Sequence, residues 1–74
     1  MKAYVLITAE VGKSPSIQEA LKAAGITECD ATAGTYDLVA IVEAEDPKRL
    51  GELVMGVIQK TGGVLSTVTL LGIG

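Results

Sequence analysis

Two segments of this chain carry apolar side chains at both odd and even positions, and no other feature of the sequence restricts the fold as strongly. They run from Lys2 to Glu10 and from Tyr36 to Ala44. Both are rich in Val, Leu and Ile, which favours β-strands. Because successive side chains of a strand point to opposite faces, both faces of these strands must be covered.

The segment after the first strand predicts an amphipathic helix. Its apolar residues recur at spacings of three and four, and the stripe consists of Ile17, Ala20, Leu21 and Ala24. Two starts remain open: Ser14 as N-cap with Pro15 in the first turn, or Ser16 and Glu19 as a capping box. Gly25 is expected to end the helix in a left-handed conformation.

A second strand pair follows. The segment from Thr27 to Ala33 is weakly apolar, and its charges at Glu28 and Asp30 are typical of an edge strand that avoids pairing with other chains. We expect a tight turn containing Gly34 to join it to the strand that begins at Tyr36.

The remaining elements are a helix and a strand. Asp46 and Pro47 have the pattern of an N-cap and first turn, and Gly62 and Gly63 follow the helix. The last strand is expected from Val64 to Leu71. The helix has an apolar stripe that consists of Leu50, Leu53, Val54, Val57 and Ile58.

The order βαββαβ predicts an α+β fold of the ferredoxin-like type, with antiparallel strand order 4-1-3-2 and both helices on one face of the sheet. The two central strands in that order are the two that are apolar on both faces. The face without helices then exposes either Tyr4 and Leu6 or Val5 and Ile7. We expect a second copy to cover it, sheet against sheet, in a dimeric αβ-sandwich.

Composition supports assembly. A chain of 74 residues has room for one domain, and a core of this size contributes no more than about 3–5 kcal/mol without further help. The only cysteine, Cys29, cannot form an internal disulfide, and the absence of histidine removes the usual metal ligands. Oligomerisation is the remaining way to add stability.

Charge and pattern exclude several classes of function. The net charge is −3 with scattered Lys and Arg residues, so direct nucleic-acid binding is not expected. No segment reaches the roughly 20 apolar residues of a membrane span, no secretory signal is evident, and the single thiol fits a cytoplasmic protein.

Catalysis is not expected either. The chain offers no Ser-His or Cys-His pair and no glycine-rich phosphate-binding pattern, and we predict neither an enzyme nor a cofactor. Cys29 lies between Glu28 and Asp30, whose charges should raise the pKa of its thiol and lower its reactivity.

Three motifs follow one another along the chain: AYVLI at residues 3–7, the G-x-Y-D turn of Gly34, Tyr36 and Asp37, and STVTL at residues 66–70. The chain resembles the effector-binding domain of the Lrp/AsnC transcription regulators, and more narrowly the stand-alone members that lack a DNA-binding part. It departs from the family at Gly62, where a proline is frequent, so the loop before the last strand is expected to differ.

The resemblance implies a dimer, further assembled into rings of dimers, that binds amino acids or similar small metabolites between dimers. A full-length regulator of the family is a further implied partner. The implied site combines one subunit's turn with the last strand of its neighbour, and its residues are Gly34, Thr35, Tyr36, Asp37, Thr67, Val68 and Thr69.

The chemistry of these residues suits an amino acid. Asp37 can hold the ammonium, while N–H groups of the turn and the hydroxyls of Thr67 and Thr69 can hold the carboxylate. A structural interpretation stands beside this one. Glycine and aspartate suit turns, threonine favours strands, and Tyr36 suits an interface or a sheet edge.

We therefore predict a single ligand-binding domain over residues 1–74, without a DNA-binding domain, that acts as an effector-binding and oligomerisation module. Two alternatives remain: a ligand-free oligomerisation module, and an amino-acid sensor of the ACT type. Gly12 is compatible with the first turn of an ACT domain, but the later G-x-Y-D turn favours Lrp/AsnC.

Overall fold

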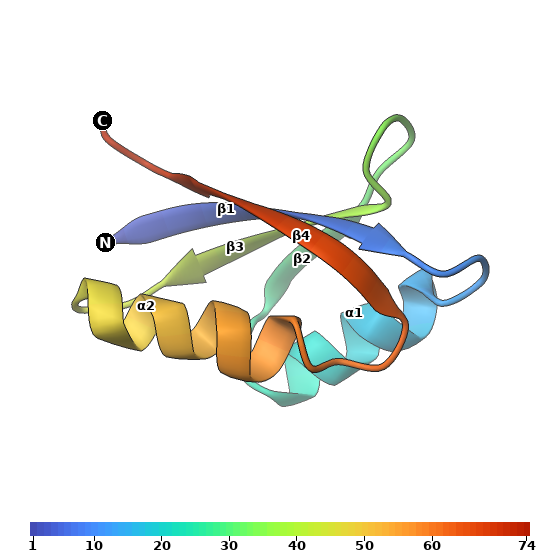
Figure 1. Cartoon of the computed structure of the whole chain (residues 1–74), viewed down its shortest axis with the longest axis horizontal. Coiled ribbons are helices and arrows are strands. Elements are labelled where there is room, and N and C mark those ends of the chain that lie inside the picture. Colours follow the sequence, from blue (N-terminus) through green and yellow to red (C-terminus); the bar gives the residue numbers. More distant parts are fainter.

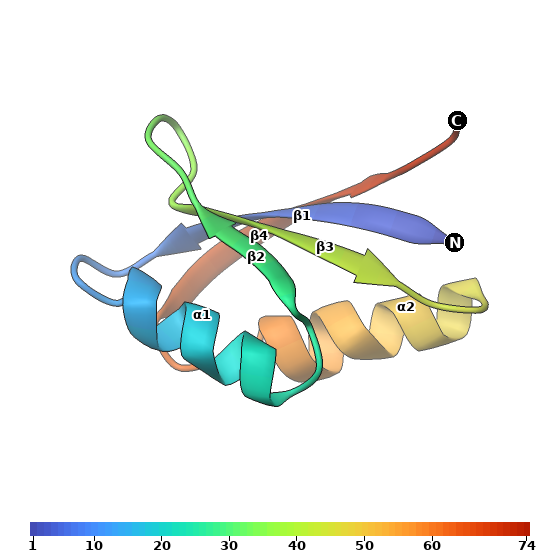
Figure 2. The same cartoon turned by 180° about the vertical axis from the view of Figure 1, so that it is seen from behind.

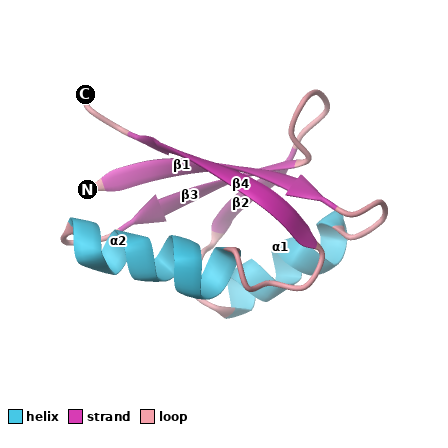
Figure 3. Cartoon of the chain, in the orientation of Figure 1, coloured by secondary structure: helices cyan, strands magenta, loops and turns pink.

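The computed structural model describes all residues 1–74 and has two layers, a four-stranded sheet and a layer of two helices beneath it (Figures 1 and 3). The strands pair antiparallel in the order β2-β3-β1-β4, which confirms the predicted order and topology. In chain order the elements are β1 (Lys2–Ala9), α1 (Ser14–Ala23), β2 (Glu28–Ala31), β3 (Leu38–Glu43), α2 (Pro47–Leu53), a π-helical turn (Val54–Ile58) and β4 (Val64–Leu71). No helix is long and apolar enough to cross a membrane.

Strand pairing decides which face of the sheet the helices cover. Val5 pairs with Ala40 and Ile7 with Leu38, and all four side chains are fully buried. The odd residues of β1 therefore face the helices, and Tyr4 and Leu6 lie on the opposite face. The core consists of Ala3, Val5, Ile7, Ala9, Ile17, Leu21, Ile26, Leu38, Ala40, Val42, Leu50, Val54 and Ile58.

Helix α1 ends as predicted but begins differently. Gly25 has φ of +94°, its amide donates to the carbonyl of Lys22, and the amide of Ile26 donates to the carbonyl of Leu21. These two bonds form a Schellman motif, and the left-handed residue favours glycine.

Both predicted starts of α1 are wrong. The capping position is Lys13, which is already in the helical region and offers no side-chain cap. The hydroxyl of Ser16 donates to the carbonyl of Lys13 instead of accepting from an amide. The Lys13 amide donates to Glu10 in a preceding turn. The chain therefore enters the helix without the extended residue that a capping serine requires.

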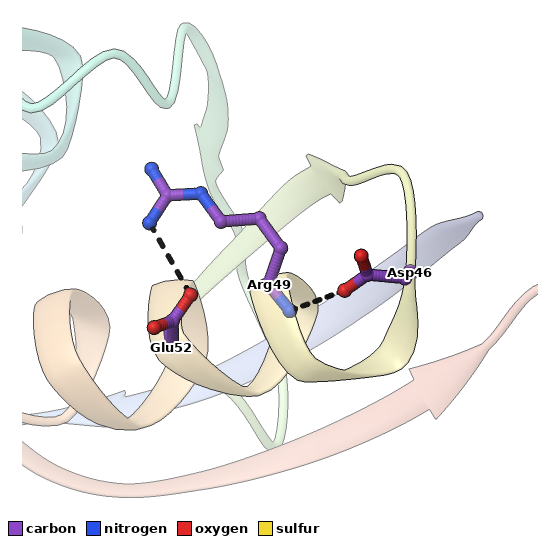
Figure 4. A network of polar contacts seen from close by, with 3 residues as sticks. All are labelled: Asp46, Arg49 and Glu52. Carbon is purple, nitrogen blue, oxygen red and sulfur yellow. Dashed lines mark hydrogen bonds and ion pairs between the residues drawn. The ribbon is translucent and has the colours of Figure 1, made fainter.

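Helix α2 begins at the predicted cap. The Asp46 carboxylate accepts a hydrogen bond from the Arg49 amide at 2.8 Å, and an exposed Arg49–Glu52 pair at 3.8 Å follows on the next turn (Figure 4). The cap stabilises the helix by about 1 kcal/mol, and the exposed pair adds less. The predicted apolar stripe is confirmed, because Leu50, Val54 and Ile58 are buried, with Leu53 and Val57 packed beside them.

The second half of this helix widens into a π-helical turn, which the sequence pattern did not indicate. The Gln59 amide donates to the carbonyl of Val54, five residues earlier, at 2.9 Å. The hydroxyl of Thr61 donates to the carbonyl of Val57 at 2.8 Å.

The loop before β4 depends on Gly63. The φ of Gly63 is +98°, and a Cβ atom at this position would lie 2.9 Å from the Cβ of Lys13. Its carbonyl accepts a hydrogen bond from the Glu10 amide at 2.8 Å. Glycine at this position therefore allows the end of β1, the start of α1 and the start of β4 to meet.

The connection between β2 and β3 is longer than the predicted tight turn, which was wrong. Residues 32–37 form a loop that projects away from the helix layer (Figure 2). The hydroxyl of Thr32 donates to the carbonyl of Tyr36 at 2.6 Å and closes the loop. Asp37 is held by β1, because its amide donates to Ile7 and its carboxylate accepts from Ala9.

Candidate functional site

The first half of the predicted site lies in the loop between β2 and β3. Gly34 and Thr35 are exposed, and Gly34 has φ of +143°. Tyr36 and Asp37 are half-buried. Oδ2 of Asp37 accepts a hydrogen bond from the Ala9 amide at 2.7 Å, whereas Oδ1 has no partner within the chain. One oxygen of the carboxylate therefore holds the end of β1, and the other is available to a cation.

The second half lies on β4, where neighbouring residues face opposite sides of the sheet. Val68 pairs with Leu6 on the face without helices, and 41% of its surface is exposed. Thr67 and Thr69 pair with Ile7 and Val5 and point to the helix side. The Thr67 hydroxyl accepts a hydrogen bond from Gln59 at 3.0 Å, while the Thr69 side chain is exposed.

A single chain does not bring these halves together. Leu38, next to Asp37, pairs with Ile7, and Ile7 pairs on its other side with Thr67. Strand β1 therefore separates the loop from β4. A ligand that lies between two subunits could contact the loop of one and β4 of the other.

Sequence reasoning missed a groove between α2 and β4. It has a volume of about 470 Å³, and none of its lining residues has a charged side chain. We call it the α2–β4 groove. Its walls include Leu50, Gly51, Val54, Met55, Thr69 and Leu71. The only sequence signal was the uncharged run from Thr61 to Gly74, which does not reveal that the helix side of an edge strand stays uncovered.

The face of the sheet without helices is apolar, and we call it the open face. Tyr4, Val68 and Leu70 are 37%, 41% and 49% exposed. Leu6, Val39 and Ile41 lie among them and are half-buried. The ammonium of Lys2 lies 5.4 Å from the centre of the Tyr4 ring, at the end of this surface.

Cys29 has the environment of an unreactive thiol. Burial raises its pKa above the usual range, and the neighbouring charge of Asp30 raises it further. The predicted direction is confirmed, although burial outweighs the acidic neighbour. A thiol with a raised pKa is protonated near neutral pH and is a poor nucleophile.

Comparisons with known proteins identify the family. The sequence model of the Lrp/AsnC ligand binding domain matches residues 2–73. The crystal structure of TTHA0845 from Thermus thermophilus superposes with a TM-score of 0.90 at 32% identity, over 99% of this chain and 92% of that one. No curated protein sequence matches.

Two more distant structures share the fold. Escherichia coli AsnC has a TM-score of 0.90 at 23% identity, over 99% of this chain and 50% of AsnC. The transcriptional regulator NMB0573 from Neisseria meningitidis, solved as a complex with L-Met, has a TM-score of 0.77 at 15% identity, over 99% of this chain and 49% of that one. Because the family match spans nearly the whole sequence, this chain belongs to the Lrp/AsnC ligand-binding domain family.

Proposed function

We propose that this protein is an effector-binding and oligomerisation module that binds an amino acid between neighbouring subunits and transmits the signal through its own assembly. Domains of this family are oligomeric and bind small molecules, and the family is regulatory, not a known enzyme family. The observation that supports the proposal most is the division of the site: β1 separates the loop from β4 within one chain, and two neighbouring subunits could bring a loop and a β4 strand together around one ligand.

The open face supports assembly as a homodimer. At roughly 25 cal/mol per Å² of apolar surface, leaving its six large side chains in water would forfeit several kcal/mol, comparable with the net stability of a small domain. A second copy, packed sheet against sheet, covers the same surface on both subunits. Such dimers then associate into a ring in which the loop of one dimer meets β4 of the next.

The groups on the two halves match a zwitterion. Oδ1 of Asp37 accepts from the ligand's ammonium, and the amides of the Gly34 turn and the Thr69 hydroxyl donate to its carboxylate. The L-Met complex of NMB0573 supports an amino acid as ligand on this fold.

Any effect on transcription would be indirect in this proposal. With a net charge of −3 and scattered Lys and Arg residues, the module acts in the cytoplasm through a full-length regulator of its family, without catalysis.

The test is calorimetric titration of the twenty amino acids into the wild type, D37A and D37N. A charge-assisted hydrogen bond contributes about 1.5–3 kcal/mol, so both variants should bind the effector about ten- to a hundredfold more weakly. D37N is the matched control, because its amide oxygen still accepts from the Ala9 amide. We expect D37N to melt close to the wild type and D37A to melt lower. T69V should lose less affinity, since it removes one of several donors to the ligand's carboxylate, whereas the Asp37 variants remove the only acceptor for its ammonium.

A ligand-free oligomerisation module is the second candidate, and the bond from the Ala9 amide to Asp37 favours it by giving that carboxylate a structural role. It predicts that D37A lowers the melting temperature and that no amino acid binds at millimolar concentration. Equal ligand affinity of D37N and the wild type would contradict the proposed role of Asp37.

A further inference from the structure

The outer edge of β4 carries unpaired main-chain groups. The Gly72 amide donates to the carbonyl of Lys2 at 2.8 Å, and the strands remain in register from there to Thr67. In an antiparallel pair, hydrogen-bonded residues alternate with residues whose N–H and C=O groups point away from the partner strand. Leu71, Thr69 and Thr67 are in this second set, and no strand lies on the far side of β4. Thr69 therefore offers a free amide and a free carbonyl.

The α2–β4 groove lies directly beside these groups. Strand β4 crosses over the helical segment (Figure 1). The side chains of Thr69 and Leu71 face the helix side of β4 and line the groove together with Val54 and Met55. Leu71 is 55% exposed and Met55 is 64% exposed, so apolar surface on both walls is open to a ligand. The Thr69 hydroxyl has no hydrogen-bond partner within the chain and stands at the border between the groove and the edge.

This arrangement fits the two ends of one amino acid. Its carboxylate can accept from the Thr69 amide and hydroxyl, while its side chain enters the groove. Its ammonium then faces outward, where Asp37 of a neighbouring subunit would meet it under the proposed function.

We propose that the α2–β4 groove is the pocket for the ligand's side chain and that it selects amino acids with uncharged aliphatic side chains, such as leucine, isoleucine and methionine. This inference rests on the proposed function and specifies its ligand. Most of the groove wall is apolar, and its two strongest polar groups are already engaged: the Met1 ammonium donates to the carbonyl of Ala44 at 2.9 Å, and the side-chain amide of Gln59 donates to the Thr67 hydroxyl at 3.0 Å. A charged or polar side chain would therefore lose more hydration in the groove than it regains in hydrogen bonds. The volume of about 470 Å³ is in the range of small-molecule pockets.

Two glycines of the helical segment give a matched pair of variants. Gly51 lines the groove, Gly56 does not, and neither would bring a new Cβ within 4 Å of another atom. Neither has a positive φ, so a larger side chain introduces no backbone strain. G51L fills the groove, whereas G56L adds the same side chain elsewhere on the same segment. Leucine is a better helix former than glycine, so G51L should fold.

The experiment is calorimetric titration of leucine, methionine, asparagine, glutamate, lysine and glycine into the wild type, G51L and G56L, with melting curves of each protein. We expect leucine and methionine to bind the wild type roughly ten- to a hundredfold more tightly than glycine, the gain that burial of an aliphatic side chain gives. G51L should lose that preference and still bind glycine as the wild type does. G56L should retain the wild-type order.

The outcomes separate the two proposals. If asparagine, glutamate or lysine binds the wild type as tightly as leucine does, or if G51L binds leucine unchanged, the groove is not the side-chain pocket, and the proposed function stands. If no amino acid binds the wild type, the proposed function fails and this inference fails with it.

Discussion

The two faces of the sheet are both apolar, yet the chain covers only one of them. On the helix side Val5, Ile7 and Leu38 are fully buried, and on the open face Tyr4 and Leu70 are 37% and 49% exposed. Strands β1 and β3 carry residues of both faces, because side chains alternate along each strand. The difference between the faces therefore comes from where the helices lie and not from hydrophobicity.

Side-chain size also distinguishes the faces. The helix side includes Ala3, Ala9 and Ala40, whose small side chains allow helices to pack close to the sheet. The open face has larger residues, including Tyr4 and Leu6. One face thus fits a close, permanent cover within the chain. The other presents broad apolar surface of the kind that a second sheet covers at about 10 Å.

The largest effect is expected from a charge on the covered face. I7D places a carboxylate at a fully buried position with no partner, which costs several kcal/mol and approaches or exceeds the net stability of a small domain. We expect circular dichroism to show an unfolded or aggregated chain at every concentration. A folded I7D protein with a wild-type melting temperature would contradict the assignment of the two faces.

A charge at the neighbouring residue, Leu6, should weaken assembly and not folding. L6D places its carboxylate on the open face, where it obstructs assembly and leaves the core of the chain intact. If the proposed dimer forms through this face, we expect sedimentation to show its loss at micromolar concentration, and the melting temperature to fall and lose its dependence on protein concentration. An L6D protein that sediments like the wild type would show that another surface holds the assembly together.

Strand number and topology could be predicted because alternation is a local pattern. The segments around Val5 and Val42 are apolar at both odd and even positions, and this pattern identified them as the central strands. The sequence does not tell whether the odd or the even residues of these strands face the helices, since that depends on where two distant helices pack. The loop at Gly34 was predicted too short because the Asp37 carboxylate bonds an amide 28 residues earlier in the chain, which no local turn rule includes.

The candidate site was only partly accessible to sequence reasoning. Motif resemblance named Asp37 and Thr69, whose placement depends on pairing with β1. The α2–β4 groove could not be predicted, because its walls come from the helical segment and β4, whose relative placement no local pattern gives. The widened turn that begins at Val54 likewise had no sequence signal, since its apolar spacing also fits an ordinary helix.

The smallest expected effect tests how completely the helices shield the rim of the covered face. Cys29 of β2 pairs with Ala40 and lies at that rim. Burial, and secondarily the charge of Asp30, raises the pKa of its thiol, so the folded chain favours the protonated form. Its contribution to stability is therefore fully present below the pKa of an unfolded thiol, about 8.5, and is lost as the pH rises through the higher folded pKa.

We expect the free energy of unfolding of the wild type to fall relative to that of C29A between about pH 7.5 and about pH 10, at one fixed protein concentration. The difference between the two proteins isolates Cys29, because the tyrosines and lysines titrate in both. D30N should leave most of the fall in place, since burial is the larger cause. Parallel curves for the wild type and C29A would mean that water reaches Cys29 as freely as it reaches the open face, and that the helix cover ends before the edge of the sheet.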